Sequence, residues 1–197
     1  MAREKGLPPI YTAESKVLIL GTFPSAKSRK EGIYYAESWQ EYWKEKNKHP
    51  DDSEIDYLFG NVATNFNGNK FWKVIYHYIG FTQWKNELIV PEFDKQKEVL
   101  DKCKIAVWDL IKECDIDGSK DRTIENPVFN DLQWFLQETK IEWILFNGKK
   151  AFEMYQNEEK FKNLPVQYKI LPSTSRQNLR HFSFAPWLDA LKSILNK

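Results

Sequence analysis

Four short apolar runs in this sequence are each followed by polar, small or glycine- and proline-containing residues that could bind a ligand. The four following stretches are GTFPSAKS (21–28), WDLIKECDIDGSKD (108–121), FNGKKA (146–151) and LPSTSRQN (171–178). If the runs are parallel strands, their carboxyl ends meet at one edge of a sheet, where open α/β sheets bind ligands. Serines, lysines and the starts of helices at such an edge suit a phosphate group. The pattern therefore predicts a phosphate-binding rim built from four loops.

A fifth stretch, GNKFW (68–72), places the Asn69 amide beside two large aromatic side chains. An asparagine carbonyl can orient a water molecule, and the amide NH₂ can donate to a developing negative charge. Asparagine also caps the first turn of helices, and a helical pattern begins here. Asp109, at the end of the second apolar run, has two similar interpretations: a carboxyl group that binds a ligand, or a cap for the turn after a strand. The residues alone leave both open.

Basic residues gather next to these stretches, namely Lys27, Arg29, Lys30, Lys149, Lys150, Arg176 and Arg180. Acidic residues concentrate elsewhere, notably in DDSEID (51–56). A nucleic-acid backbone requires cations clustered on one face, which a protein with a net charge of +1 can still supply. The alternative is that these are ordinary solvated charges.

Several familiar sites are absent from the sequence. It has no GxxxxGK[ST] loop for a nucleoside triphosphate, no GxGxxG fingerprint for a dinucleotide and no GxSxG nucleophile elbow. Its three histidines lack metal-ligand spacing, and its two cysteines cannot supply a four-cysteine zinc or iron–sulfur site. We therefore expect no metal site, and the sequence gives no support for a nucleoside triphosphate or dinucleotide site.

The composition is that of a globular protein, with 197 residues, 42% of them hydrophobic and 29% charged. The start, MAREKGLPPIYTAESK, lacks the apolar run of a signal peptide, and no stretch approaches the ~20 apolar residues of a membrane span. We expect a cytoplasmic monomer with reduced thiols and no membrane partner. Aromatic residues make up 15% of the chain. Either some of them stack on flat ligands or they all fill the core.

The four apolar runs predict the central sheet, and they are Lys16–Gly21, Lys104–Asp109, Glu142–Gly148 and Gln167–Pro172. They are mostly continuous rather than alternating, which is typical of parallel strands covered on both faces. Helical patterns lie between or after them, at 69–80, 93–103, 130–139, 148–157 and 185–197. This alternation predicts a three-layer α/β/α fold with a four-stranded parallel sheet, in one domain spanning residues 1–197.

Residues Glu37–Asn67 break this alternation, because they hold no clear strand and begin with a charged, tryptophan-containing helical pattern. We predict an insertion that acts as a lid or as a flap facing a nucleic acid. The alternative is an ordinary helix packed on the edge of the sheet.

In their order along the chain, LILGTFPSAKS, YY, GNKFW, AVWDLI with DGSKD, FNGKKAFE and LPSTS resemble the uracil-DNA glycosylase superfamily. The resemblance runs from Val17 to Trp187 apart from the insertion. It is strongest to the hypoxanthine (deoxyinosine)-DNA glycosylase branch, followed by the mismatch-specific thymine/uracil glycosylases. FNG alone would be weak, whereas the ordered set ending in LPSTS is specific. The resemblance implies a monofunctional enzyme that flips a deaminated base out of DNA and cleaves its N-glycosidic bond without a cofactor. Hypoxanthine is the expected base, with uracil or xanthine as alternatives.

The resemblance also implies roles for individual residues. In the mismatch-specific branch the first loop reads Gly-x-Asn-Pro-Gly and its Asn positions the attacking water, but Phe23 occupies that position here. The hypoxanthine branch uses the Asn of an N-x-F-W element instead, which corresponds to Asn69. We therefore expect catalysis by Asn69 and Asp109. The expected base pocket consists of Gly21, Thr22, Phe23, Pro24, Tyr35, Phe71 and Asn147. The expected DNA contacts are Ser25, Lys27, Ser28, Lys149, Pro172, Ser173, Thr174, Ser175 and Arg176.

The sequence departs from the family pattern in two places. A long insertion separates Tyr35 from Asn69, and Arg176 stands where a proline usually follows PSTS. Two other functions remain open: a non-catalytic nucleic-acid-binding protein on the same fold, and a nucleotide-modifying enzyme of unrelated α/β type. Loss of the first-loop amide is compatible with the former.

Overall fold

The computed structural model describes residues 2–36, 68–79 and 93–196. Its centre is a parallel sheet of β2 (Val17–Gly21), β3 (Ile105–Asp109), β6 (Trp143–Asn147) and β7 (Gln167–Leu171), in the order β3-β2-β6-β7. The four predicted strands are confirmed, each within one residue of its expected ends. The predicted insertion Glu37–Asn67 lies outside the described residues.

The register of the sheet brings its polar strand ends together. In the parallel pairs, Gly21 lies opposite Asp109, and Asn147 lies opposite Leu171. Strands β2 and β3 are buried along their whole length, as their continuous apolar runs predict. Strand β7, at one edge of the sheet, is less buried, and its Tyr168 and Ile170 are exposed.

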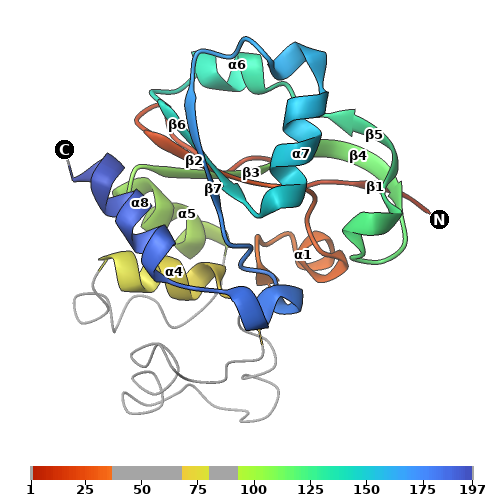
Figure 1. Ribbon diagram of the computed structural model, residues 1–197, viewed down its shortest axis with the longest axis horizontal. Coiled ribbons are helices and arrows are strands. Elements are labelled where there is room, and N and C mark those ends of the chain that lie inside the picture. The colour runs from red at the N-terminus through yellow and green to blue at the C-terminus, as the bar shows by residue number, and fades with distance from the viewer. Residues whose placement is uncertain (1, 37–67, 80–92, 197) are drawn as a thin grey trace.

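Helices cover the sheet as the sequence pattern predicts. They are α4 (Phe71–Ile79), α5 (Phe93–Lys102), α6 (Leu132–Gln137), α7 (Lys149–Asn157) and α8 (Ala185–Leu195). Figure 1 shows α4, α5 and α8 gathered on one side of the molecule and α7 on the other side of the sheet. The three-layer α/β/α prediction is confirmed. The short helix α1 (Ala26–Glu31), which follows the first loop, is not predicted from the sequence; Ser25 caps its start, and Gly32 ends it with a φ of 68°.

A second, antiparallel sheet was not expected from the sequence. It consists of β1 (Ala2–Lys5), β4 (Ile111–Ile116) and β5 (Glu125–Phe129), in the order β1-β4-β5. Only Leu110 separates β3 from β4, so the chain passes from one sheet directly into the other. The turn between β4 and β5 returns toward α1, with a 3₁₀ helix, η4, at Asp121–Thr123. In the described part of the chain, no helix is both long and apolar enough to cross a membrane.

Candidate active site

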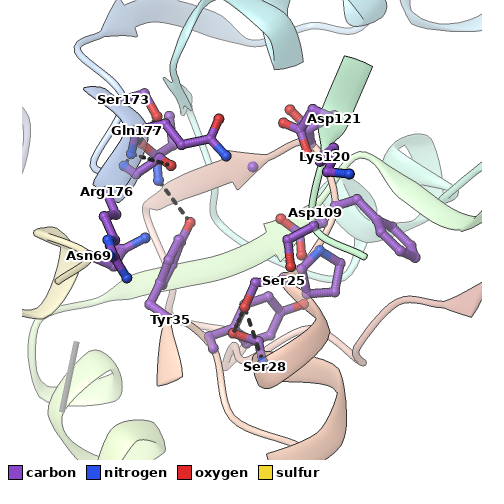
Figure 2. A pocket seen from close by; sticks show the side chains of 18 of the residues that line it. Ser25, Ser28, Tyr35, Asn69, Asp109, Lys120, Asp121, Ser173, Arg176 and Gln177 are labelled. Carbon is purple, nitrogen blue, oxygen red and sulfur yellow. Dashed lines mark hydrogen bonds between the residues drawn. The ribbon is translucent and has the colours of Figure 1, made fainter. Parts of the chain in front are cut away.

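A cavity of about 800 Å³ opens at the carboxyl ends of the parallel strands. It is lined by Gly21, Thr22, Phe23, Pro24, Ser25, Ser28, Tyr34, Tyr35, Asn69, Asp109, Ser119, Lys120, Asp121, Arg122, Asn147, Ser173, Ser175, Arg176 and Gln177. Figure 2 shows Asn69 and Arg176 on one side of this cavity, Asp109, Lys120 and Asp121 on the other, and Tyr35 between them. The strand-end loops therefore meet around one cavity of a size that small-molecule sites commonly have.

Asn69 lines the cavity from the start of α4 and is half-buried. Its side-chain oxygen accepts a hydrogen bond of 2.9 Å from the backbone N–H of Phe71, the first residue of α4, and so satisfies one of the N–H groups that the start of a helix leaves without a partner in the helix. The N–H of Lys70 donates to the carbonyl of Thr174 at 2.8 Å, which ties the start of α4 to the loop after β7. The cap and the cavity-lining position belong to the same amide, so neither interpretation of Asn69 excludes the other.

Asp109 lies at the end of β3, and only 4% of its surface is exposed. Its Oδ2 atom has no hydrogen-bond partner among the described residues. Burial, followed by the nearby Asp121 carboxyl, raises the pKa of Asp109 to about 8. The group is therefore a neutral carboxylic acid at pH 7, able to donate a hydrogen bond as well as to accept one.

Gly21 makes room for this carboxyl group on the neighbouring strand. A Cβ atom at position 21 would lie 2.2 Å from Asp109 Oδ1 and 3.5 Å from the Tyr35 hydroxyl. No side chain fits at that distance, so the glycine is required by the approach of Asp109.

Tyr35 forms the wall between Asn69 and Asp109, and its backbone φ of 55° is unusual for a bulky residue. Its ring stacks on Phe71, with centroids 4.0 Å apart and planes inclined by 20°. Phe71 itself is fully buried and does not line the cavity. The structure thus places the half-buried Tyr35 ring at the wall of the cavity and Phe71 as the support behind it.

Asn147, at the end of β6, is engaged on both sides of its amide. Its Nδ2 donates to the Tyr35 hydroxyl at 3.1 Å and to Thr174 Oγ1 at 2.9 Å, while its Oδ1 accepts from the Thr174 N–H at 2.8 Å. Thr174 is completely buried. Both N–H groups of the amide are used internally, so the geometry fits a residue that positions Tyr35 and the last loop better than one that donates to a base.

The first loop contributes Thr22, Phe23 and Pro24 to the cavity, followed by the two serines of the α1 cap, Ser25 and Ser28. Ser28 N–H and Ser28 Oγ both lie 3.1 Å from Ser25 Oγ.

Arg29, one of the expected rim cations, is instead turned inward. It donates to the carbonyls of Pro24 at 2.6 Å and Gly118 at 3.1 Å and lies 5.1 Å from the Phe23 ring centroid.

The predicted DNA-contact residues divide into two groups. Ser173, Ser175 and Arg176 line the cavity together with the two serines of the α1 cap. Those that do not line it are Lys27 on α1, Lys149 at the start of α7, Pro172 and Thr174. The Pro172 carbonyl accepts a hydrogen bond of 2.8 Å from Trp187 Nε1, which anchors the last loop to α8.

Several lining residues are not among the individually predicted site residues, above all Ser119, Lys120, Asp121 and Arg122 in the turn before β5, although the stretch 108–121 is predicted as part of the rim. Ser119 Oγ accepts from the N–H of Ala26 at 2.8 Å, and Asp121 has a side-chain hydrogen bond with Thr22. These bonds dock the turn against the first loop. The signal was present as DGSKD after the second strand, but its position depends on the antiparallel sheet. Tyr34 and Gln177 were also missed.

No group of three or more histidine, cysteine or acidic side chains within the described residues could hold a metal ion. Asp109 and Asp121 are the acidic side chains that line the cavity.

Comparisons with known proteins agree with the resemblance seen in the sequence. Residues 8–193 match the family described as the uracil DNA glycosylase superfamily. A hypoxanthine DNA glycosylase from Methanosarcina acetivorans is 28% identical over 178 residues, which cover 90% of this chain and 89% of that protein. A hypoxanthine DNA glycosylase from Methanosarcina barkeri is 25% identical over 193 residues, covering 96% and 99%. The fold is similar to the solution NMR structure of a candidate uracil DNA glycosylase from M. acetivorans, with a TM-score of 0.65, 24% identity and coverage of 98% and 99%.

Proposed function

Because the chain belongs to the uracil DNA glycosylase superfamily, we propose that it is a DNA glycosylase that flips hypoxanthine out of DNA and cleaves its N-glycosidic bond. The proposal rests on one observation: Asn69 and the buried carboxyl group of Asp109 line the same cavity. The names of the two Methanosarcina relatives support hypoxanthine as the base.

The cavity suits a base that has left the DNA stack, which costs a few kcal/mol that the site must offset. Tyr35 and Phe23 provide aromatic surface on which such a base can stack. Asn69, held by its bond with Phe71, orients a water molecule or donates to the departing base. Ser173, Ser175 and Arg176 lie at the same opening, where the phosphates on either side of the flipped nucleotide would pass.

The proposal includes a monofunctional reaction, in which water rather than an amine attacks the sugar. The lysine that lines the cavity within the described residues is Lys120, and its ammonium group is paired with Asp117 at 2.7 Å. An amine nucleophile would form a Schiff base with the abasic sugar, which borohydride would trap as a covalent complex. We expect no trapped complex.

We further propose that the enzyme works as a cytoplasmic monomer, with residues 1–197 forming one glycosylase domain that carries an insertion at about 37–67. The described residues on either side of that insertion line the same cavity, Tyr35 before it and Asn69 after it. One chain therefore supplies the residues that the proposed reaction uses. Light scattering at working concentration tests the monomer.

The test of function is incubation with DNA duplexes that contain a single hypoxanthine, uracil or xanthine, followed by alkali. A glycosylase leaves an abasic site that alkali converts to a strand break, and we expect the hypoxanthine duplex to be cut fastest. Asn69→Ala serves as the matched variant. Binding of the duplexes without strand breaks would identify a non-catalytic DNA-binding protein. Binding of free nucleotides without affinity for DNA would identify a nucleotide-modifying enzyme.

A further inference from the structure

A buried carboxyl group without a hydrogen-bond partner at one of its oxygens is costly if it is ionised, because a buried charge must be paired. Asp109 is such a group: it is 4% exposed, and its Oδ2 is unpartnered among the described residues. Asp109 nevertheless lines the cavity, and it fits there because the neighbouring Gly21 has no side chain. The neutral acid satisfies the geometry, since it carries a proton that can be donated into the cavity.

The ionisable groups around Asp109 favour this neutral form. Asp121 lines the same cavity from the turn before β5, where it has a side-chain hydrogen bond with Thr22. Its negative charge raises the pKa of Asp109 further, while burial raises the pKa of Asp121 itself. Tyr34 and Tyr35 face it from the segment after α1, and burial raises the pKa of both phenols, which therefore stay uncharged. Of the cations near Asp121, Lys120 is paired with Asp117, and Lys150 favours the ionised form of Asp121 by lowering its pKa.

We propose that Asp109 is the proton donor to N7 of the departing purine base, and that Asp121 is a positioning residue that keeps the proton on Asp109. The inference rests on the proposed glycosylase function and deepens it. A flipped purine offers N7 of its imidazole ring as a proton acceptor, whereas uracil has no such nitrogen.

The reaction balances without any further reactant. The Asp109 proton moves to N7 as the C1′–N9 bond breaks, and both electrons of that bond leave with the purine. The purine departs neutral, the sugar carries the positive charge, and Asp109 becomes a carboxylate. Water then adds to C1′, and the proton that it releases restores the acid form of Asp109. Donation by a positioned acid typically accelerates such a step by about 10²–10⁴-fold.

The first experiment measures single-turnover excision of hypoxanthine from pH 5 to pH 10. For the wild type we expect a rate that falls about tenfold per pH unit above pH 8, because the donor form of Asp109 is lost as the pH rises through its pKa of about 8. Asp109→Asn should lose about 10²–10⁴-fold at pH 7 and show no alkaline decline. Asp121→Asn should move the decline to lower pH, since it removes the charge that holds the proton on Asp109.

The matched control is Asp101→Asn, the same change at an exposed position near the amino ends of the strands, which should keep the wild-type profile. A second experiment uses only the wild type, so that it does not depend on the folding of a variant. A duplex with 7-deazahypoxanthine lacks the N7 acceptor, and we expect it to be excised no faster than Asp109→Asn excises hypoxanthine.

The outcomes separate this inference from the proposed function. If the wild type excises hypoxanthine but shows no alkaline decline, or excises the 7-deaza base at the same rate, the proton-donor role is overturned and the glycosylase stands. An Asp121→Asn profile identical to that of the wild type removes Asp121 from the mechanism. If the wild type releases no base from any duplex, the proposed function fails, and this inference fails with it.

Discussion

At the scale of single residues, Asn69 combines a structural contact at the start of α4 with the catalytic role that we propose for it. Its oxygen caps α4 through the N–H of Phe71, which fixes the direction of the whole planar group at the edge of the cavity. A group that is already held in place loses little freedom when it engages a water molecule or a base. The cap therefore preorganises the amide for the proposed reaction.

The two roles of Asn69 can be separated by a pair of substitutions. Asn69→Ala removes both, and we expect a loss of ~10²–10³-fold in single-turnover excision and of about 1 kcal/mol in the free energy of unfolding. Asn69→Ser keeps a side-chain acceptor at the start of α4 but has no amide. It should therefore recover the wild-type free energy of unfolding but not the wild-type rate of excision. Urea denaturation and excision assays on both variants provide the measurements. Wild-type excision by Asn69→Ser would place the catalytic group elsewhere.

The raised pKa of Asp109 should affect the stability of the fold as well as the rate of excision. Its pKa is raised from 3.8 to about 8, so between these values the folded protein holds a proton that the unfolded chain releases. The contribution of Asp109 to the free energy of unfolding must then fall as the pH rises from 4 to 8, by up to about 1.4 kcal/mol per pH unit. Asp109→Asn should flatten this fall, whereas Asp101→Asn should not, as urea denaturation across that range would show. Parallel curves for the wild type and Asp109→Asn would contradict the raised pKa.

The sequence could predict the place, though not the role, of residues next to a strand end or a helix start. Asn69 and Asp109 line the cavity as expected, because each is adjacent to an element that the apolar pattern reveals. The positions of Asp121 and Arg29 could not be predicted. Their places depend on the docking of one loop against another, through Ser119 and the Gly118 carbonyl, and no periodic pattern records such a contact.

At the scale of elements, the parallel sheet could be predicted because continuous apolar runs have one physical explanation, burial on both faces. The antiparallel sheet could not. Strand β4 reads IKECDI, with buried and exposed residues mixed, and β5 contains a proline. Short strands of this kind look like polar loop until their partners are known. β4 and β5 nevertheless matter to the site, since they carry the turn with Asp121 into the cavity.

The close approach of β2 and β3 at their carboxyl ends can be tested with a double-mutant cycle. Gly21→Ala places a methyl group 2.2 Å from Asp109 Oδ1, so we expect it to displace the carboxyl group, reduce excision and destabilise the fold by about 1–3 kcal/mol. In an Asp109→Ala background that oxygen is absent, and the same change should cost much less. Urea denaturation of the wild type, the two single variants and the double variant gives the coupling energy between positions 21 and 109. Equal costs in both backgrounds would show that the contact does not determine the requirement for glycine.

At the scale of the whole molecule, a net charge of +1 must be distributed unevenly if the protein binds DNA. The exposed cations near the cavity come from separate elements: Lys120 and Arg122 from the turn before β5, Lys149 from the start of α7 and Arg176 from the loop after β7. A duplex whose flipped nucleotide enters the cavity would pass over this rim. The rest of the surface need not be basic, which explains how a nearly neutral protein can carry such a site.

Arg176 provides the test of this arrangement, because it is exposed, lines the cavity and begins the 3₁₀ helix η6 (Arg176–His181) after the last loop. Each phosphate that a cation neutralises contributes about one unit to the slope of log affinity against log salt. Arg176→Ala should therefore lower that slope by about one and weaken binding to every sequence similarly. Lys140→Ala is the matched control, since Lys140 is exposed just before the amino end of β6 and is paired with Glu14 at 2.7 Å. Fluorescence anisotropy of a hypoxanthine duplex between 50 and 200 mM salt, the range over which such contacts are resolved, measures both variants. A slope unchanged by Arg176→Ala would mean that DNA approaches the cavity from another side.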